Sequence, residues 1–404
     1  MAHPRLSSLF EYLTDELVAF RRDLHAHPEI GHTEYRSTQR VAERLTRAGL
    51  EPQLLPGTGL ICDIGEPGRR TIALRADLDA LPLPEETGLP FASTTEGVCH
   101  ACGHDVHTAA LLGAALVLSE LEASGRLPGR VRLIFQPAEE VNPGGALTVI
   151  ANGGLDDVER AYALHCDPGR DVGVIGVRGG PITSASDSIL VRLDGPGGHT
   201  SRPHVTGDLV FALAQVVTQV PAILSRRLDP RAGIAMVWGR IRAGGAPNAI
   251  PRFGEVAGTF RCLDTAVWAR AGSLITDAVH EVVAPYGVRA EVTHTRGVPP
   301  TVNDADAVLL VEEAVQAELG EGSVVLAEQS LGGEDFAWML EKVPGAMMRL
   351  GTRTPGGRTY DLHQGDLVVD ERAIVIGARV LTAIALTDLG RAGTDRARDD
   401  SLAG

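Results

Sequence analysis

Aromatic residues, basic charge and cysteine are all scarce in this sequence. Phe, Trp and Tyr make up 4% of the 404 residues, which gives no indication of a large aromatic binding cage. The 37 basic side chains are outnumbered by 52 acidic ones, so the formal net charge is -15. Nucleic acids and anionic membranes bind basic patches, and we therefore expect neither as a partner. A small anionic substrate would need a locally positive pocket.

The cysteines and the N-terminal segment bear on the compartment. Five cysteines at irregular spacing do not form a disulfide framework, and unpaired thiols indicate a reducing environment. The N-terminal stretch is amphipathic and carries acidic side chains, unlike the apolar core of a signal peptide. No window approaches the roughly 20 apolar residues of a membrane span. We therefore expect a cytoplasmic protein outside the membrane.

Helical and strand-like patterns alternate along the first part of the chain. Apolar residues recur at helical spacing in residues 8–24, 38–48 and 108–121. Strand-like aliphatic runs cover residues 71–76, 130–135 and 160–164. This alternation predicts an α/β fold with a mostly parallel central sheet covered by helices.

The pattern changes at about residue 185, where the predicted elements follow the order β-α-β-β-α-β. That order is typical of a ferredoxin-like α+β unit, one sheet with two helices. We therefore interpret residues 185–296 as a domain inserted between two parts of the first domain, residues 1–184 and 297–404. Residues 393–404 are polar and rich in charge, and we expect them to be disordered.

Ligand-type side chains occur at separate places along the chain. Cys102 and His104 lie two residues apart, and a thiolate and an imidazole at that spacing can bind one metal or two neighbouring ones. The later candidates are Glu140 in the pair Glu139-Glu140, His165 and His363. The glutamate pair and His165 follow strand-like runs, and cofactor sites of open α/β sheets lie at such strand ends.

The donor set restricts the choice of metal. One thiolate, one carboxylate and three imidazoles suit zinc, manganese, cobalt or nickel, and are too rich in nitrogen and sulfur for calcium or magnesium. One catalytic zinc does not need five protein ligands, whereas two metals sharing a bridging ligand and a bridging water would use them all. Two divalent ions with one thiolate, one carboxylate and one hydroxide would carry a formal charge of about +1. That charge would favour hydroxide over water and polarise a carbonyl.

The adjacent acids need separate interpretation. Neighbouring side chains of an extended segment point in opposite directions, so one glutamate can bind metal while the other acts as a general base. The alternative is that two acids after a proline only favour a helix N-terminus. Asp77 and Asp79 follow a strand, where either could orient a ligating imidazole or only cap the next turn.

Together these residues resemble a known family. The chain is similar to the metal-dependent amidohydrolases of the hippurate hydrolase, N-acyl-amino-acid amidohydrolase and plant indoleacetyl-amino-acid hydrolase group, within the aminoacylase and carboxypeptidase superfamily of di-metal peptidases. The resemblance covers nearly the whole chain. Its motifs lie in residues 21–29, 73–82, 100–107, 135–140, 248–251, 332–336 and 362–363.

The resemblance implies a ligand set and a fold. It implies that two divalent ions are bound by Cys102, His104, Glu140, His165 and His363. We expect these ions to be zinc or manganese, with cobalt or nickel as alternatives. Glu139 would be the general base, and Asp77 would orient a ligand. Arg75 stands where other di-metal members carry a ligating histidine, for which the Cys-x-His pair compensates. The implied fold is di-metal exopeptidase-like, with a lid domain through which a homodimer or higher homo-oligomer forms.

The lid domain would contribute three further residues. His199 matches a histidine that stabilises the oxyanion, supplied by its own or the partner subunit, although a turn histidine in a glycine-rich loop is the alternative. Asn248 and Arg261 match positions that touch substrate. The guanidinium of Arg261 could bind an α-carboxylate, or could instead pair with Asp264.

The sequence therefore predicts an amidase that hydrolyses N-acyl amino acids or small peptides. A dipeptidase, or an amidase of another small acylated metabolite, is the alternative within this class. Outside it are a cysteine hydrolase using Cys102 with a nearby histidine, and a non-catalytic metal-dependent binding protein. The intact Glu139-Glu140 pair argues against the binding protein. Departures from the family at Cys166-Asp167 prevent any transfer of an acyl preference.

Overall fold

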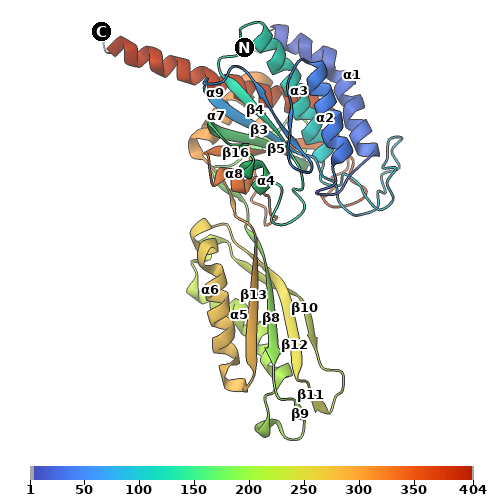
Figure 1. Cartoon of the computed structure of the whole chain (residues 1–404), viewed down its shortest axis with the longest axis vertical. Coiled ribbons are helices and arrows are strands. Elements are labelled where there is room, and N and C mark those ends of the chain that lie inside the picture. Colours follow the sequence, from blue (N-terminus) through green and yellow to red (C-terminus); the bar gives the residue numbers. More distant parts are fainter. Residues whose placement is uncertain (1–3, 403–404) are drawn as a thin grey trace. The chain divides into compact units, whose positions relative to one another are not determined.

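The computed structural model describes residues 4–402, with side chains from residue 6 to residue 391. The chain folds into two compact units (Figure 1). Unit 1 comprises the residues up to Ile182, Val302–Glu328 and the chain from Asp335 onwards. Unit 2 comprises Thr183–Thr301 and Gln329–Glu334, so residues 185–296 lie within its first segment.

Unit 1 is built around an eight-stranded sheet with the order β1-β2-β4-β3-β5-β16-β6-β15. β3 runs parallel to β4 and β5, and β5 runs parallel to β16, whereas β1 and β2 form an antiparallel edge. The predicted mostly parallel sheet is thereby confirmed. Its strands are β1 (Gln53–Leu54), β2 (Leu60–Ile64), β3 (Thr71–Asp77), β4 (Arg130–Gln136), β5 (Val158–Asp171), β6 (Ile175–Val177), β15 (Val324–Leu326) and β16 (Gly345–Arg353).

Helices cover both faces of this sheet, so every residue of β3 is buried. Leu74 and Leu164 pack into the core formed with α1, α2, α3, α7 and α9. Their strand neighbours Ala73 and Ala163 face the opposite side, in the core formed with α4 and α8. The helices are α1 (Pro4–Ala26), α2 (Tyr35–Arg47), α3 (His104–Ala123), α4 (Ala146–Ala151), α7 (Ala305–Leu319), α8 (Ala337–Leu340) and α9 (Arg372–Leu402).

The end of α9 includes most of residues 393–404, the segment that we expected to be disordered. Side chains beyond Arg391 and residues 403–404 lie outside the described part of the chain. The chain leaves unit 1 through β7 (Gly180–Thr183) and returns through β14 (Thr301–Asn303), which together form a two-stranded sheet.

Unit 2 has the predicted ferredoxin-like order β-α-β-β-α-β, with a fully antiparallel sheet of order β10-β12-β8-β13. Its main elements are β8 (Ser186–Asp194), α5 (Leu209–Arg227), β10 (Ala235–Ala243), β12 (Phe253–Arg261), α6 (Thr265–Val283) and β13 (Arg289–Val298). A short ribbon pairs β9 (Gly198–His199) with β11 (Ala249–Ile250). Single 3-10 turns cover Pro203–Val205, Pro230–Ala232 and Ala284–Tyr286.

Local sequence explains the elements of unit 2. Buried residues alternate with half-buried or exposed ones along β8, because one face of the sheet packs on α5 and α6 while the other does not. Asp208 accepts a hydrogen bond from the Phe211 N–H at the start of α5, and Asp264 accepts one from the Val267 N–H at the start of α6. Each aspartate thereby satisfies an amide that the helix leaves unpaired.

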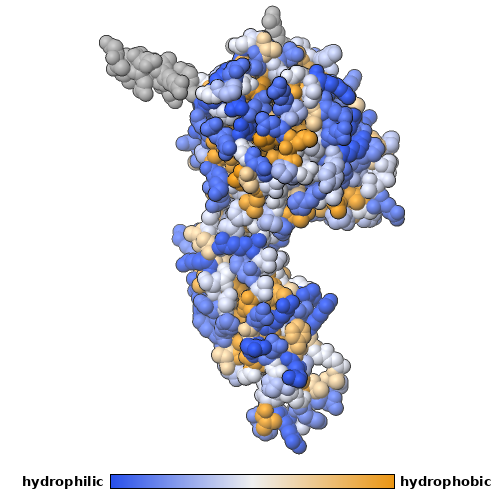
Figure 2. Space-filling view, viewed as in Figure 1, coloured by the Kyte–Doolittle hydropathy of each residue, from blue (hydrophilic) through white to orange (hydrophobic). Residues whose placement is uncertain are grey.

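The expectation that no segment approaches a membrane span is wrong on length and composition. Three helical segments are long and apolar enough to cross a membrane: His104–Ala123, Leu209–Arg227 and Arg372–Arg391. In the first and last, 78% and 61% of the apolar window is buried within the protein, against 33% for Leu209–Arg227. The apolar character of α3 and α9 is therefore used in packing unit 1. Figure 2 shows hydrophilic and hydrophobic residues interspersed on the visible face of each unit.

Candidate metal centre

The strand order of unit 1 brings the predicted ligands to one edge of the sheet. β4, β3 and β5 are adjacent and parallel, so the chain segments that follow them meet at their carboxyl ends. Glu139 and Glu140 come just after β4. His165 lies within β5, two residues beyond the last residue paired with β3, rather than at the end of the strand as its sequence suggests.

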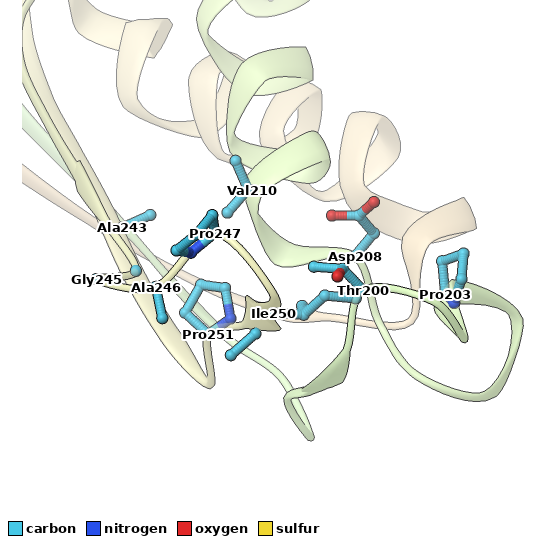
Figure 3. Close-up of a pocket in the computed structure, with 12 residues that line it drawn as sticks. Thr200, Pro203, Asp208, Val210, Ala243, Gly245, Ala246, Pro247, Ile250 and Pro251 are labelled. Carbon is cyan, nitrogen blue, oxygen red and sulfur yellow. The ribbon is translucent and has the colours of Figure 1, made fainter.

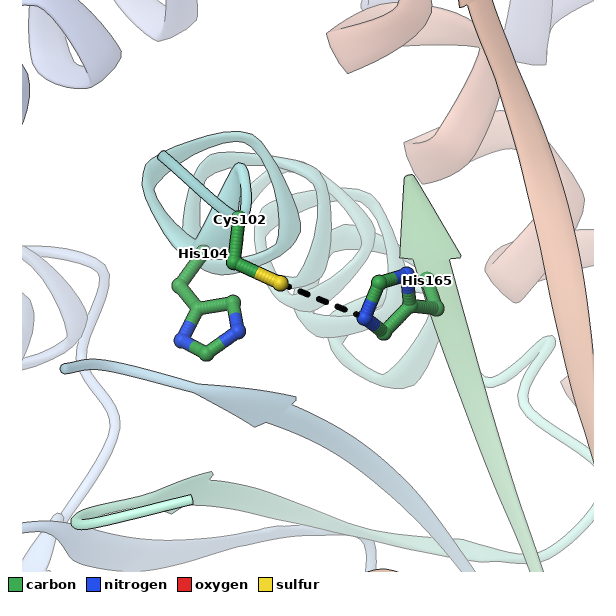
Figure 4. A group of neighbouring side chains, drawn as sticks. All are labelled: Cys102, His104 and His165. Carbon is green, nitrogen blue, oxygen red and sulfur yellow. Dashed lines mark hydrogen bonds between the residues drawn. The ribbon is translucent and has the colours of Figure 1, made fainter. Parts of the chain in front are cut away.

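The start of α3 supplies the thiol and an imidazole to this edge. Gly103 has a φ of 85°, a left-handed conformation that favours glycine, and it separates Cys102 from His104, the first residue of the helix. Figure 4 shows the Cys102 thiol pointing towards His165, and Cys102 Sγ lies 3.5 Å from His165 Nε2. A donor set from a helix start and a strand is therefore already assembled.

All five predicted ligands and the predicted base belong to overlapping groups of donor atoms. Within each group, the candidate donor atoms lie within 4.8 Å of one another. Three groups consist only of these six residues: Cys102-His104-His165, Cys102-Glu140-His363 and His104-Glu139-Glu140. Because Cys102, His104 and Glu140 each belong to two of these three groups, the arrangement suits neighbouring metal positions with shared ligands.

The protonation of these side chains also fits a cation. His104 Nε2 is fully buried and makes no hydrogen bond to any residue that the structure describes, which is rare for a buried nitrogen. Burial raises the pKa of the Cys102 thiol, and hydrogen bonds with Cys102 and Glu140 raise the pKa of His363 to about 10. Burial lowers the pKa of His165. Without metal the site holds protons that a divalent cation would displace, so its residues fit the metal.

Two aspartates at the end of β3 hold the imidazoles of α3: Asp77 is its last residue, and Asp79 comes two residues later. Asp79 Oδ1 lies 3.2 Å from His104 Nδ1, while Asp79 Oδ2 accepts the Glu140 N–H at 2.9 Å. Asp79 therefore connects two predicted ligands. The sequence left its role open between orienting a ligand and capping a turn.

Asp77, which the resemblance selects for orienting a ligand, makes its closest imidazole contact with His107. Asp77 Oδ1 lies 2.6 Å from His107 Nδ1, and 3.8 Å from His104 Nδ1. The Cys166 N–H donates to His107 Nε2 at 2.7 Å, so the ring proton of His107 must be on Nδ1. His107 thereby connects Asp77 to the peptide next to His165.

Arg75, in β3, carries a buried positive charge. Its guanidinium lies 2.6 Å from Asp77 Oδ2 and 2.9 Å from Asp335 Oδ1, and it also donates to Gln136 Oε1. Asp335 in turn accepts hydrogen bonds from Gln136 Nε2 and the Ala146 N–H. At the position where the resemblance implies a ligating histidine in other di-metal members, this chain therefore has a positive charge that neutralises two buried carboxylates.

Replacing Arg75 by methionine is expected to lower the free energy of unfolding by about 3–5 kcal/mol, because both carboxylates would stay buried without their cation. Urea denaturation measures this loss. Arg47→Met is the matched control, since Arg47 pairs with Glu43 on the surface of α2 and its side chain is 68% exposed. That control should change stability by less than about 1 kcal/mol. Equal effects of the two substitutions would contradict a structural role for the buried charge.

Unit 2 brings two of its three predicted residues together. His199 in β9 pairs with Ala249 in β11, and the Thr200 N–H donates to the Asn248 carbonyl at 3.3 Å. The His199 side chain is exposed, and its Nδ1 accepts the Ser201 N–H at 3.1 Å. The Nε2 edge of His199 is therefore the one that can donate to a ligand.

Arg261 lies apart from that ribbon, at the end of β12. Its guanidinium donates to the Leu331 carbonyl, whereas Asp264, the alternative partner considered for it, caps α6. The sequence-based pairing of Arg261 with Asp264 is thus replaced by a backbone contact.

A cavity of about 520 Å³ lies beside the β9–β11 ribbon within unit 2 (Figure 3). Val210, Pro247, Ile250 and Pro251 give it mostly apolar walls, and Asp208 and Thr200 contribute polar groups. Its size falls in the range of small-molecule sites.

Comparisons with known proteins find matches over most of the chain. Residues 73–387 match the family model described as Peptidase family M20/M25/M40. The chain is 37% identical over 366 residues to the N-acetyl-L-cysteine deacetylase of Bacillus subtilis, covering 90% of this chain and 86% of the relative. It is 33% identical to the crystal structure of the Bacillus subtilis YXEP protein, described as a dinuclear metal binding peptidase from the M20 family. That match has a TM-score of 0.83 and covers 94% of this chain and 99% of the other.

A further relative is longer than this chain. A Rhodococcus jostii protein named "Putative glutamate--cysteine ligase 2-3" is 52% identical over 370 residues, covering 91% of this chain. The match covers only 46% of the relative, so this chain spans about half of that protein's length.

Proposed function

Because the chain belongs to the peptidase family M20/M25/M40, whose members hydrolyse amides, we propose that it cleaves the amide bond of N-acyl amino acids. The observation that carries this proposal is the cluster of overlapping donor groups at the sheet edge, with Glu139 as an additional carboxylate beside the predicted ligands. A site built only to bind metal would not need that additional carboxylate.

We propose that Cys102, His104, Glu140, His165 and His363 hold two divalent ions, zinc or manganese before cobalt or nickel. When bound, such ions supply Lewis acidity and make water more acidic. Glu139 takes the proton of the attacking water on its carboxylate and later donates it to the nitrogen of the leaving amine. His199 donates a hydrogen bond to the developing oxyanion, and Asn248 and Arg261 position the substrate.

A substrate panel tests this proposal. We expect the protein, stripped of metal under reducing conditions, to release free amino acid only after zinc, manganese, cobalt or nickel is restored. The panel compares acetyl, benzoyl, indoleacetyl and longer acyl conjugates with dipeptides. N-acetylcysteine and glutamate–cysteine dipeptides are included because the names of two relatives point to them. No release by folded, metal-loaded protein from any conjugate would contradict the proposal.

A cysteine hydrolase is the second candidate, favoured by the 3.5 Å contact between Cys102 Sγ and His165 Nε2. Burial raises the pKa of this thiol, which disfavours the thiolate nucleophile that such a mechanism needs. Full activity in the presence of a chelator, together with an acyl group trapped on Cys102, would favour this candidate over the metal-dependent one.

A further inference from the structure

The residue that precedes the two glutamates has a strained backbone. Ala138 has a φ of 53°, in the left-handed region that residues with a Cβ rarely adopt. This conformation brings Cβ too close to the backbone, and alanine has no polar side chain with which to offset the strain. Such strain persists only where surrounding contacts hold it in place, and it occurs often at functional sites.

A buried carboxyl group from a distant part of the chain holds this peptide. The Ala138 N–H donates to Glu34 Oε1 at 2.7 Å, and Thr58 Oγ1 donates to Glu34 Oε2 at 2.6 Å. The Ala138 carbonyl accepts the Gly145 N–H at 2.9 Å. Glu34 is 0% exposed, so its carboxyl group faces the protein interior and not solvent.

The side chain of Glu34 does not cap the helix that it precedes. It stands at the N-cap of α2 but makes no side-chain cap hydrogen bond. Glu29 performs that task instead, accepting the N–H groups of Arg36 and Ser37 at 2.9 and 2.8 Å. Burying a carboxyl group is energetically unfavourable, and helix capping does not offset that free energy here.

The backbone on both sides of Glu139 is therefore held by carboxylates from elsewhere. Glu34 holds the N–H of Ala138, and Asp79 holds the N–H of Glu140 at 2.9 Å. Between them, Glu139 Oε2 lies 4.0 Å from His104 Nε2, and Glu140 Oε1 lies 3.2 Å from His363 Nε2. The directions of the two glutamate side chains depend on this turn.

We propose that Glu34 is a positioning residue, which fixes the left-handed Ala138 peptide and thereby directs Glu139 towards substrate and Glu140 towards metal. This inference rests on the proposed function for its catalytic consequence. Its consequence for metal binding is independent of any substrate.

The test combines Glu34→Ala with three companions. In Glu34→Ala at saturating zinc we expect kcat to fall about 100-fold, because the base is misplaced. Zinc affinity, measured by titration with the metal alone, should fall about tenfold. Glu34→Gln should stay close to wild type in both, since its amide oxygen can still accept the Ala138 N–H. Glu29→Ala, which removes a carboxylate from the same loop, should lower the melting temperature without either effect.

Glycine at position 138 separates positioning from general stability. Glycine adopts a positive φ without strain, so adding Ala138→Gly to Glu34→Ala should recover about tenfold in kcat. A merely structural role would give no recovery. Folded Glu34→Ala that matches Glu29→Ala in kcat and zinc affinity would overturn the inference, as would the lack of any recovery. If wild type hydrolyses nothing, the proposed function fails by itself, and the zinc titrations of Glu34→Ala and Glu34→Gln decide the inference alone.

Discussion

Replacing Glu139 by glutamine is expected to lower kcat by about three orders of magnitude and to leave zinc affinity nearly unchanged. Glutamine keeps the size and the hydrogen-bonding oxygen of the side chain, but it cannot take a proton from water and return it to the leaving amine. The carboxylate lies close enough to act there, since its Oε2 is 4.0 Å from His104 Nε2 and its side chain is 8% exposed. Steady-state kinetics at saturating zinc, with zinc titration by calorimetry, measure both quantities.

The neighbouring residue supplies the matched control. Glu140→Gln changes an adjacent side chain in the same way, but Glu140 belongs with Cys102 and His363 in a donor group from which Glu139 is absent. We therefore expect Glu140→Gln to weaken zinc binding, which Glu139→Gln should not do. Unchanged turnover in Glu139→Gln would exclude it as the base. A large loss of zinc affinity in that variant would instead make Glu139 a ligand.

The fold could be predicted from the sequence because its signals are local. The alternation along residues 71–164 reports strands buried on both faces, and the alternating burial of Ser186–Asp194 reports a sheet with one packed face. Each pattern depends only on where nearby side chains point. The apolar length of α3 was underestimated from the sequence: its length and composition are those of a membrane span, and its packing places it inside unit 1.

Most candidate ligands were also accessible from the sequence, because Cys102 and His104 stand at the start of α3, Glu140 follows β4 and His165 lies within β5. The groups that hold those ligands were not. Asp77 and Asp79 lie two residues apart at the end of β3, and only the three-dimensional structure shows that Asp79 contacts His104 while Asp77 makes its closest contact with His107. No local pattern separates two aspartates on the same side of one strand end.

Glu34 was missed altogether for a related reason. It lies 104 positions before Ala138, and an acid just before a helix normally reads as a cap. The strained backbone of Ala138 could not be predicted from the sequence either, since alanine gives no sequence signal for a positive φ. Contacts of this kind arise when the sheet brings remote loops together.

Replacing Cys102 by serine is expected to weaken zinc binding at least about 100-fold and to remove nearly all turnover at ordinary zinc concentrations. Cys102 belongs to two of the donor groups, so each of these groups would lose a donor atom. A serine hydroxyl cannot supply the anionic ligand that a thiolate provides. Zinc titration and turnover across zinc concentrations measure the effect, and the thiolate-to-metal absorption of the cobalt-loaded protein should disappear with it.

Cys62→Ala provides the control, because Cys62 is equally buried, in β2, but belongs to none of the donor groups. It should keep zinc affinity and turnover, apart from a modest loss of stability.

The two roles considered for Cys102, metal ligand and nucleophile, predict different results. A ligand predicts that chelation abolishes wild-type turnover, and that the serine variant loses metal and activity together. A nucleophile predicts that wild-type turnover survives the chelator, and that the serine variant loses activity while its zinc affinity is unchanged. Because a buried thiol becomes a thiolate only when a cation compensates its charge, we expect the first result.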